Sequence, residues 1–279
     1  MKISNKKGKS LHNSMISALL GGAVGLIRRP SLIALGIVAA ALLTVCMYFL
    51  FEIAFLFILE ISLGGSAILG ADILAVPFTL LAFYPLETLS FTLFVFTMLA
   101  INIWLLQGFA IAENDENKGI VTVVGNTVAS TGRVLMTSFT AFAIIALYII
   151  FSGIYFFITG FLWAIPFLPV VFILIWLLVS LYIYLKLVFF MVISVSGKAK
   201  GSDVLKATWK WSNGKLTGIV IFILLASIIS NAILGIGFAA SDFTDEFTGY
   251  LAIMLFYALS SAYASFAYVK YYSHSKGKA

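Results

Sequence analysis

The chain has 279 residues, of which 62% are hydrophobic and only 10% are charged, and its mean hydropathy is +1.12. Soluble domains carry about 25% charged residues, so this composition excludes a soluble protein and predicts an integral membrane protein with one membrane domain. The net charge of +6 does not indicate a nucleic-acid partner, because the basic residues gather in loops on one side, as the positive-inside rule requires.

The chain begins with a polar segment, residues 1–11, which we predict to be a cytoplasmic tail. Residues 12–27 carry apolar side chains at near-helical spacing, and this short stretch ends at Arg28 and Arg29. Such a segment favours an interfacial helix that lies in the plane of the membrane rather than a span.

The first predicted span, residues 31–51, follows Pro30, which fits the first turn of a helix. Its length matches the roughly 20 residues that cross a hydrocarbon core. Glu52 is expected near the outer interface. Residues 66–85 are apolar but interrupted by Asp72 and two prolines, and this pattern favours either a re-entrant or a surface half-helix.

Five more apolar runs are long enough to span the membrane, so the predicted membrane domain, residues 12–272, has six spans in total. A cytoplasmic tail at residues 273–279 completes the chain. The five runs are residues 89–112, 134–157, 170–195, 216–238 and 250–269. Interfacial segments resembling residues 12–27 precede two of them, at 120–130 and 202–211. The predicted fold is therefore all-α, with six transmembrane helices and three interfacial helices on the cytoplasmic side.

The lysines and arginines determine the predicted orientation. They lie in the N-terminal region up to Arg29, in the loops at 113–133 and 196–215, and in the C-terminal region from Lys270, while Lys186 alone falls inside a span. The predicted outer loops contain none. Both termini are therefore expected in the cytoplasm, and the protein is expected in the plasma membrane.

A pattern recurs three times, in residues 14–43, 119–147 and 202–230. Each copy consists of a weakly amphipathic stretch, a small turn, a basic residue and a span. The basic residue just before the span is Arg29, Arg133 or Lys215 in the three copies. A parallel threefold repeat, with its axis along the membrane normal, explains this pattern. Positive-inside selection acting separately on each inward-to-outward span explains it as well.

Two stretches carry a resemblance to a known family: Leu26–Leu32 (LIRRPSL), before the first span, and Asp203–Trp211 (DVLKATWKW), before the fifth. They resemble an uncharacterised prokaryotic family of six-span membrane proteins. That family is similar to the membrane domain that precedes the catalytic domain in some glycerophosphodiester phosphodiesterases. The resemblance implies an architecture and no reaction, because this chain contains no catalytic phosphodiesterase domain.

Polar side chains inside the spans are costly, so each is a candidate functional residue. The candidates for an intramembrane polar site are Lys186, Asn102, Gln107 and Asn231. Lys186 either extends its ammonium group to the cytoplasmic interface or has a buried role, and Asn102 is expected at a similar depth. The amides also fit simple hydrogen bonding between helices.

A second group of candidates lies on the cytoplasmic rim. It consists of Trp209, Trp211, Lys206, Lys210, Arg28 and Arg29. Tryptophan beside lysine suits a helix at the level of the lipid headgroups, with an affinity for anionic lipids. The same surface would also suit a cytosolic protein partner.

No metal-binding or nucleophile motif occurs in the sequence, and we expect no cofactor. The predicted function is therefore non-enzymatic: a lipid-associated membrane scaffold or the membrane subunit of a larger assembly. The alternative is a transporter or permease component with a path near Lys186 and Asn102.

Overall fold

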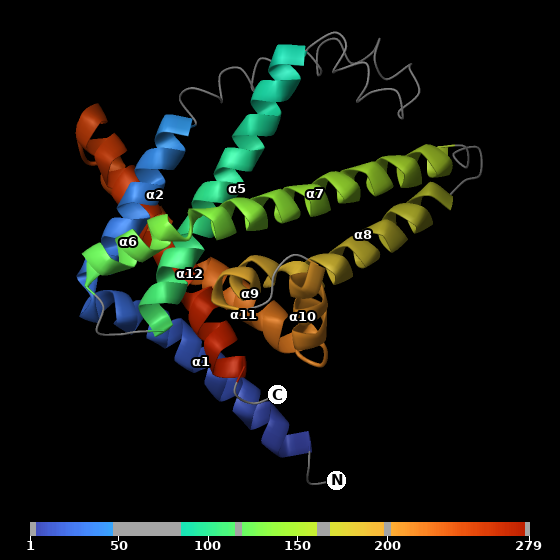
Figure 1. Cartoon of the computed structure of the whole chain (residues 1–279), viewed down its shortest axis with the longest axis horizontal. Coiled ribbons are helices and arrows are strands. Elements are labelled where there is room, and N and C mark those ends of the chain that lie inside the picture. Colours follow the sequence, from blue (N-terminus) through green and yellow to red (C-terminus); the bar gives the residue numbers. More distant parts are fainter. Residues whose placement is uncertain (1–3, 47–84, 115–118, 161–167, 198–201, 277–279) are drawn as a thin grey trace. The chain divides into compact units, whose positions relative to one another are not determined.

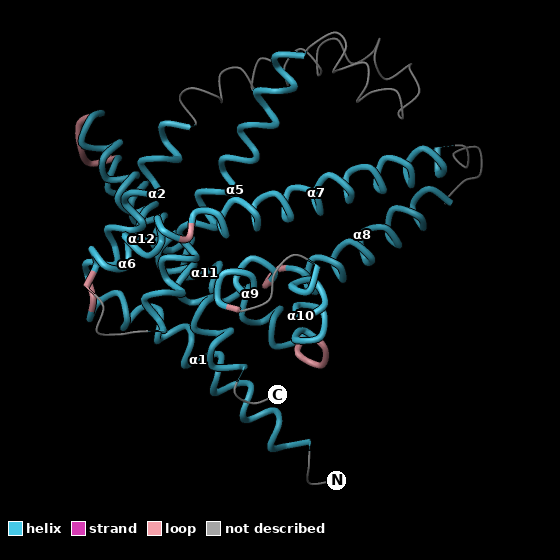
Figure 2. Tube along the Cα trace, in the orientation of Figure 1, coloured by secondary structure: helices cyan, strands magenta, loops and turns pink. Residues whose placement is uncertain are grey.

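The computed structural model describes residues 4–46, 85–114, 119–160, 168–197 and 202–276. All regular structure within these ranges is helical, and they contain no strand (Figure 2). The elements in chain order (Figure 1) are α1 (Ser4–Arg28), η1 (Pro30–Leu32), α2 (Ile33–Cys46), α5 (Pro85–Asn114), α6 (Ile120–Ala129), α7 (Thr131–Gly160), α8 (Leu168–Leu187), α9 (Phe190–Ser196), α10 (Ser202–Ser212), α11 (Leu216–Ser241) and α12 (Glu246–Lys276).

The helices confirm an all-α, multi-pass membrane fold. Five apolar stretches within the described ranges are long enough to cross a membrane. A bent pair, α1 followed by η1 and α2, raises the number of spans to six if the pair counts as one span. The five coincide with predicted spans two to six. The first predicted span is described only as far as Cys46. Glu52 and all of the predicted half-helix at 66–85 except Pro85 lie outside the described residues.

The bend between α1 and α2 is 100°, and Pro30 explains it. Proline has no backbone N–H and disfavours helical geometry in the residue before it. Arg29 accordingly leaves the helix, with φ −130° and ψ 68°, and Pro30 starts η1. If α2 crosses the membrane, this angle places α1 close to the membrane plane, as predicted for residues 12–27.

The three predicted interfacial segments are helices α1, α6 and α10. α1 begins at Ser4, so most of the segment predicted to be an N-terminal tail belongs to this helix, and α12 continues to Lys276 within the predicted C-terminal tail. The turn after α10 is formed by Gly214, whose φ of +70° is a conformation that favours glycine.

The chain divides into two compact units, which are described separately. The smaller comprises residues 43–100 and 138–183. In it, α7 and α8 form a hairpin joined by polar side chains: the Tyr148 hydroxyl donates to Ser180 Oγ over 2.8 Å, and the Tyr155 hydroxyl donates to the Phe172 carbonyl over 2.6 Å. Such bonds hold apolar helices together where the hydrophobic effect cannot.

The larger unit, residues 1–42, 101–137 and 184–279, is built around α12. Small residues on α12 allow close contact with its neighbours. A Cβ placed on Gly36 of α2 would lie 2.6 Å from the Ala258 carbonyl oxygen. On the α11 side, the Ser230 and Ser260 hydroxyl oxygens are 2.6 Å apart.

Two of the basic residues that begin the repeated spans make equivalent contacts. Arg29 Nη1 donates to the Ala112 carbonyl, in the last turn of α5, over 2.9 Å, and Lys215 Nζ donates to the Ser275 carbonyl, in the last turn of α12, over 3.2 Å. The last carbonyls of a helix lack intrahelical donors and carry partial negative charge. Each cation therefore caps the returning span of its own repeat.

The middle repeat departs from this scheme, because the Arg133 side chain is exposed. There, a buried contact of 2.7 Å between the hydroxyl oxygens of Thr137 and Ser194 joins α7 to α9. Two of the three copies thus share a capping contact that positive-inside selection alone does not require.

The predicted fourth span is not one continuous helix. It is interrupted at Val188 and Phe189, between α8 and α9. Phe189 is 1% exposed, and its ring lies 4.8 Å from the Trp211 ring and 5.3 Å from the Tyr268 ring, between centroids. Burial of this ring among aromatic side chains accounts for the interruption, which local sequence does not signal.

Asp245 caps the N-terminus of α12, accepting a bond of 3.2 Å from the Thr248 backbone N–H. We expect Asp245→Ala to lower the thermal stability of the solubilised protein at neutral pH, whereas Asp245→Asn, which keeps the acceptor, should preserve most of it.

The stability should also depend on pH. Hydrogen bonds from Thr248, first that of its side chain and second that of its backbone, lower the pKa of the Asp245 carboxyl below 3.8. The part of this stabilisation that depends on the ionised carboxylate is therefore fully present above pH 3.8 and is lost as pH falls through the folded-state pKa. If the loss of thermal stability in Asp245→Ala stayed the same in acid, the ionised carboxylate of Asp245 would not stabilise α12.

Candidate functional site

Lys186 is buried, with 3% of its surface exposed. Its ammonium group donates a hydrogen bond to Asn213 Oδ1, in the turn after α10, and lies 5.2 Å from the centroid of the Trp209 ring. The side chain thus extends toward the predicted cytoplasmic rim, as snorkelling would require, but its charge is enclosed by protein groups.

The three amides of the predicted intramembrane site lie in different environments. Asn102 is exposed, whereas Lys186 is buried. Gln107 is buried on α5, and its Oε1 has no hydrogen-bond partner among the described residues. Asn231 is exposed on α11 and bonds to Ser227 of the same helix over 3.3 Å.

The rim residues predicted on α10 separate into two groups. Lys206, Lys210 and Trp209 are exposed. Trp211 instead packs into the protein, with its ring 5.6 Å from the Tyr272 ring and 4.7 Å from the ammonium of Lys215. Burial lowers the pKa of Lys215. The surface that α10 presents to headgroups or to a partner is therefore narrower than the sequence suggests.

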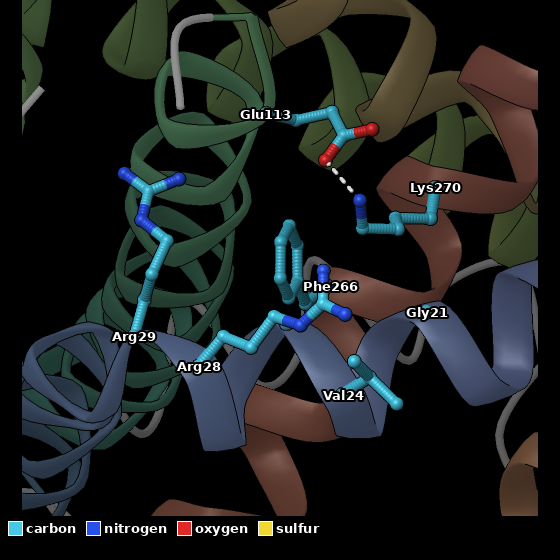
Figure 3. A pocket seen from close by; sticks show the side chains of 8 residues that line it. Gly21, Val24, Arg28, Arg29, Glu113, Phe266 and Lys270 are labelled. Carbon is cyan, nitrogen blue, oxygen red and sulfur yellow. Dashed lines mark ion pairs between the residues drawn. The ribbon is translucent and has the colours of Figure 1, made fainter. Parts of the chain in front are cut away.

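A cavity of about 170 Å³ brings the other two predicted rim residues together with groups that the sequence analysis did not single out. Figure 3 shows Arg28 and Arg29 extending from α1, with Glu113 of α5 and Lys270 of α12 opposite them. The lining residues are Gly21, Val24, Gly25, Arg28, Arg29, Glu113, Phe266 and Lys270.

Glycines on α1 make the cavity possible. A Cβ on Gly21 would lie 3.0 Å from Lys270 Cδ, and a Cβ on Gly25 would overlap the Phe266 ring. Gly25 therefore permits the close approach of α1 to α12, whereas the flexible end of the Lys270 side chain could move away from a Cβ on Gly21. Their spacing of four residues places both on one helix face.

Contacts inside the cavity hold its charged groups in place. Lys270 Nζ and Glu113 Oε2 form an ion pair at 2.7 Å, with only 14% and 16% of their side chains exposed. The Lys270 ammonium also lies 5.1 Å from the centroid of the Phe266 ring. Arg29 is fixed by its bond to the Ala112 carbonyl, while Arg28 is exposed at the mouth.

Three cations and one carboxylate line the cavity, so its formal charge is +2. Guanidinium groups present several N–H donors in a planar fork, which suits phosphate and carboxylate oxygens. The arrangement can bind an anion. Its side chains offer charge and hydrogen-bond donors to such a ligand.

Glu113 and Lys270 were not predicted as site residues. The sequence places both near the cytoplasmic ends of spans, and their opposite charges are the signal that could have paired them. Comparison of the chain with protein-family models, curated proteins and solved structures gives no match. The similarity to a phosphodiesterase membrane domain therefore stays a prediction, and the candidate site rests on its geometry.

Proposed function

We propose that this protein is a non-enzymatic plasma-membrane protein with cytoplasmic termini that binds anionic lipid headgroups and acts as a lipid-associated scaffold or membrane subunit. The cavity lined by Arg28, Arg29 and Lys270 carries the proposal. Its excess of positive charge lies on the side that the positive-inside rule assigns to the cytoplasm, where anionic lipids supply the matching charge.

The exposed face of α10 supports the same role. Lys206, Lys210 and Trp209 add two charges and an aromatic ring to this rim. The alternative, a transporter with a path near Lys186 and Asn102, needs both residues on one water-filled route. The burial of Lys186 against Trp209 and Asn213, together with the exposure of Asn102, favours the lipid-associated role.

Native mass spectrometry of the full chain, purified from its membrane in mild detergent, tests the proposal. We expect wild type to retain anionic phospholipid and Arg28→Gln to retain about fivefold less, since a basic residue near a membrane surface contributes about 1 kcal/mol. Arg28 is exposed, so this change leaves the packing intact.

Arg133→Gln is the matched control, because it removes the same charge from an exposed site in the first turn of α7, outside both the cavity lining and the α10 surface. It should retain lipid as wild type does. If both variants lose lipid equally, lipid retention depends on the overall positive charge of the rim and not on the cavity. A stoichiometric protein partner without retained lipid would overturn lipid binding and favour the membrane-subunit role.

A further inference from the structure

The charge of the cavity distinguishes between classes of phosphate ligand. Arg28 and Arg29 face it from α1, Lys270 from α12 and Glu113 from α5, and the formal sum is +2. A phosphomonoester carries about −1.5 to −2 at pH 7, with a second pKa near 6, whereas a phosphodiester carries a single negative charge. The monoester matches the cavity more closely.

The surface of α1 distinguishes a lipid from a soluble phosphate. Four apolar side chains form one exposed face along this helix: Ile16 (40% exposed), Leu20 (61%), Val24 (41%) and Ile27 (78%). Their spacing of three and four residues places them on one stripe. The opposite face, with Ala18, Gly22 and Leu26, is buried.

Val24 belongs to both features, because it lies on the apolar stripe and also lines the cavity. A ligand whose phosphate enters the cavity would therefore meet apolar surface directly beside it. A helix with one exposed apolar face at a membrane boundary places that face against acyl chains.

Extending the proposed function, on which this inference rests, we infer that the cavity binds the headgroup of a phosphomonoester lipid of the phosphatidate type. The phosphate lies among Arg28, Arg29 and Lys270, and Glu113 holds Lys270 in position. The acyl chains lie along Val24 and Leu20. Binding involves no covalent step.

Competition binding on the detergent-solubilised full chain tests the inference, with dioleoyl phosphatidate and dioleoyl phosphatidylglycerol as probes of identical acyl chains. At pH 7.5 we expect at least fivefold preference for phosphatidate. At pH 5 the preference should fall to about twofold or less, because the monoester is then singly charged. The phosphodiester lipid has no group that titrates in this range, so its binding controls for changes in the protein.

Variants and a soluble competitor separate the remaining outcomes. Arg28→Gln should weaken phosphatidate binding about fivefold, and Leu20→Ser should weaken it without altering the pH dependence. Equal affinity for both lipids, lost in Arg28→Gln, would overturn the monoester assignment and leave anionic-lipid binding intact. Affinities unchanged in Arg28→Gln would overturn both. Displacement of the lipid by millimolar inorganic phosphate would assign the cavity to a free anion.

Discussion

Replacing Gly36 with alanine is expected to lower the free energy of unfolding by about 1–3 kcal/mol, the usual cost of overpacking a close contact. The new Cβ would lie 2.6 Å from the Ala258 carbonyl oxygen and 3.0 Å from Ala262 Cβ. Because the first of these is a backbone atom of a packed helix, it cannot rotate away as the end of a flexible side chain could. The measurement is thermal or denaturant unfolding of the purified protein in detergent.

Gly235→Ala supplies the matched control, because it makes the same change within α11. Among the described residues, no atom beyond the local backbone of α11 lies within 4 Å of the added Cβ. There alanine should leave stability unchanged or raise it by up to about 1 kcal/mol, because glycine is the poorer helix former. Wild-type stability in Gly36→Ala would mean that α2 does not pack on α12 as described.

Removing the acceptor of Lys186 is the second large effect. Asn213→Ala removes this hydrogen bond from the buried lysine, and we expect a loss of about 1–3 kcal/mol in the free energy of unfolding, the range for a hydrogen bond to a charged group. Lys186→Met keeps a side chain of similar length and removes the charge. The double variant, Lys186→Met with Asn213→Ala, should therefore be more stable than Asn213→Ala alone.

This double-mutant cycle measures the coupling between the two residues by unfolding of the solubilised protein. Lys210→Met, which removes an exposed charge from α10, should change stability by no more than about 0.5 kcal/mol. Strictly additive effects of the Lys186 and Asn213 changes would show that the pair contributes no coupling energy.

The spans and interfacial helices could be predicted because each follows from local sequence. Apolar length identifies a span, and Pro30 ends α1 wherever the rest of the chain lies. The interruption at Phe189 could not be predicted, since it depends on rings from α10 and α12 that are distant in sequence. The packing of Trp211 against Tyr272 could not be predicted for the same reason.

The candidate site was only half predictable. Arg28 and Arg29 stand out as adjacent charges before a proline, but Glu113 and Lys270 read as ordinary ends of spans. Their pairing requires the ends of α5 and α12, which are distant in sequence, to lie side by side. Likewise, the sequence predicts Asn102 of α5 at the depth of Lys186, whereas the hydrogen bond of Lys186 is made to Asn213 in the turn after α10.

Arg29 and Lys215 have a consequence for how this chain is assembled. If positive charge before each outgoing span directs its insertion, Arg29 and Lys215 act twice. During synthesis they orient the span, and in the folded protein they bind the last turn of the helix that returns to the same side. Moving either charge two residues along its loop would leave the insertion signal intact and break the hydrogen bond. Membrane insertion and folding therefore both depend on these two positions. The number of positive charges in the loop would satisfy insertion alone, whereas the hydrogen bond requires the charge at the exact position.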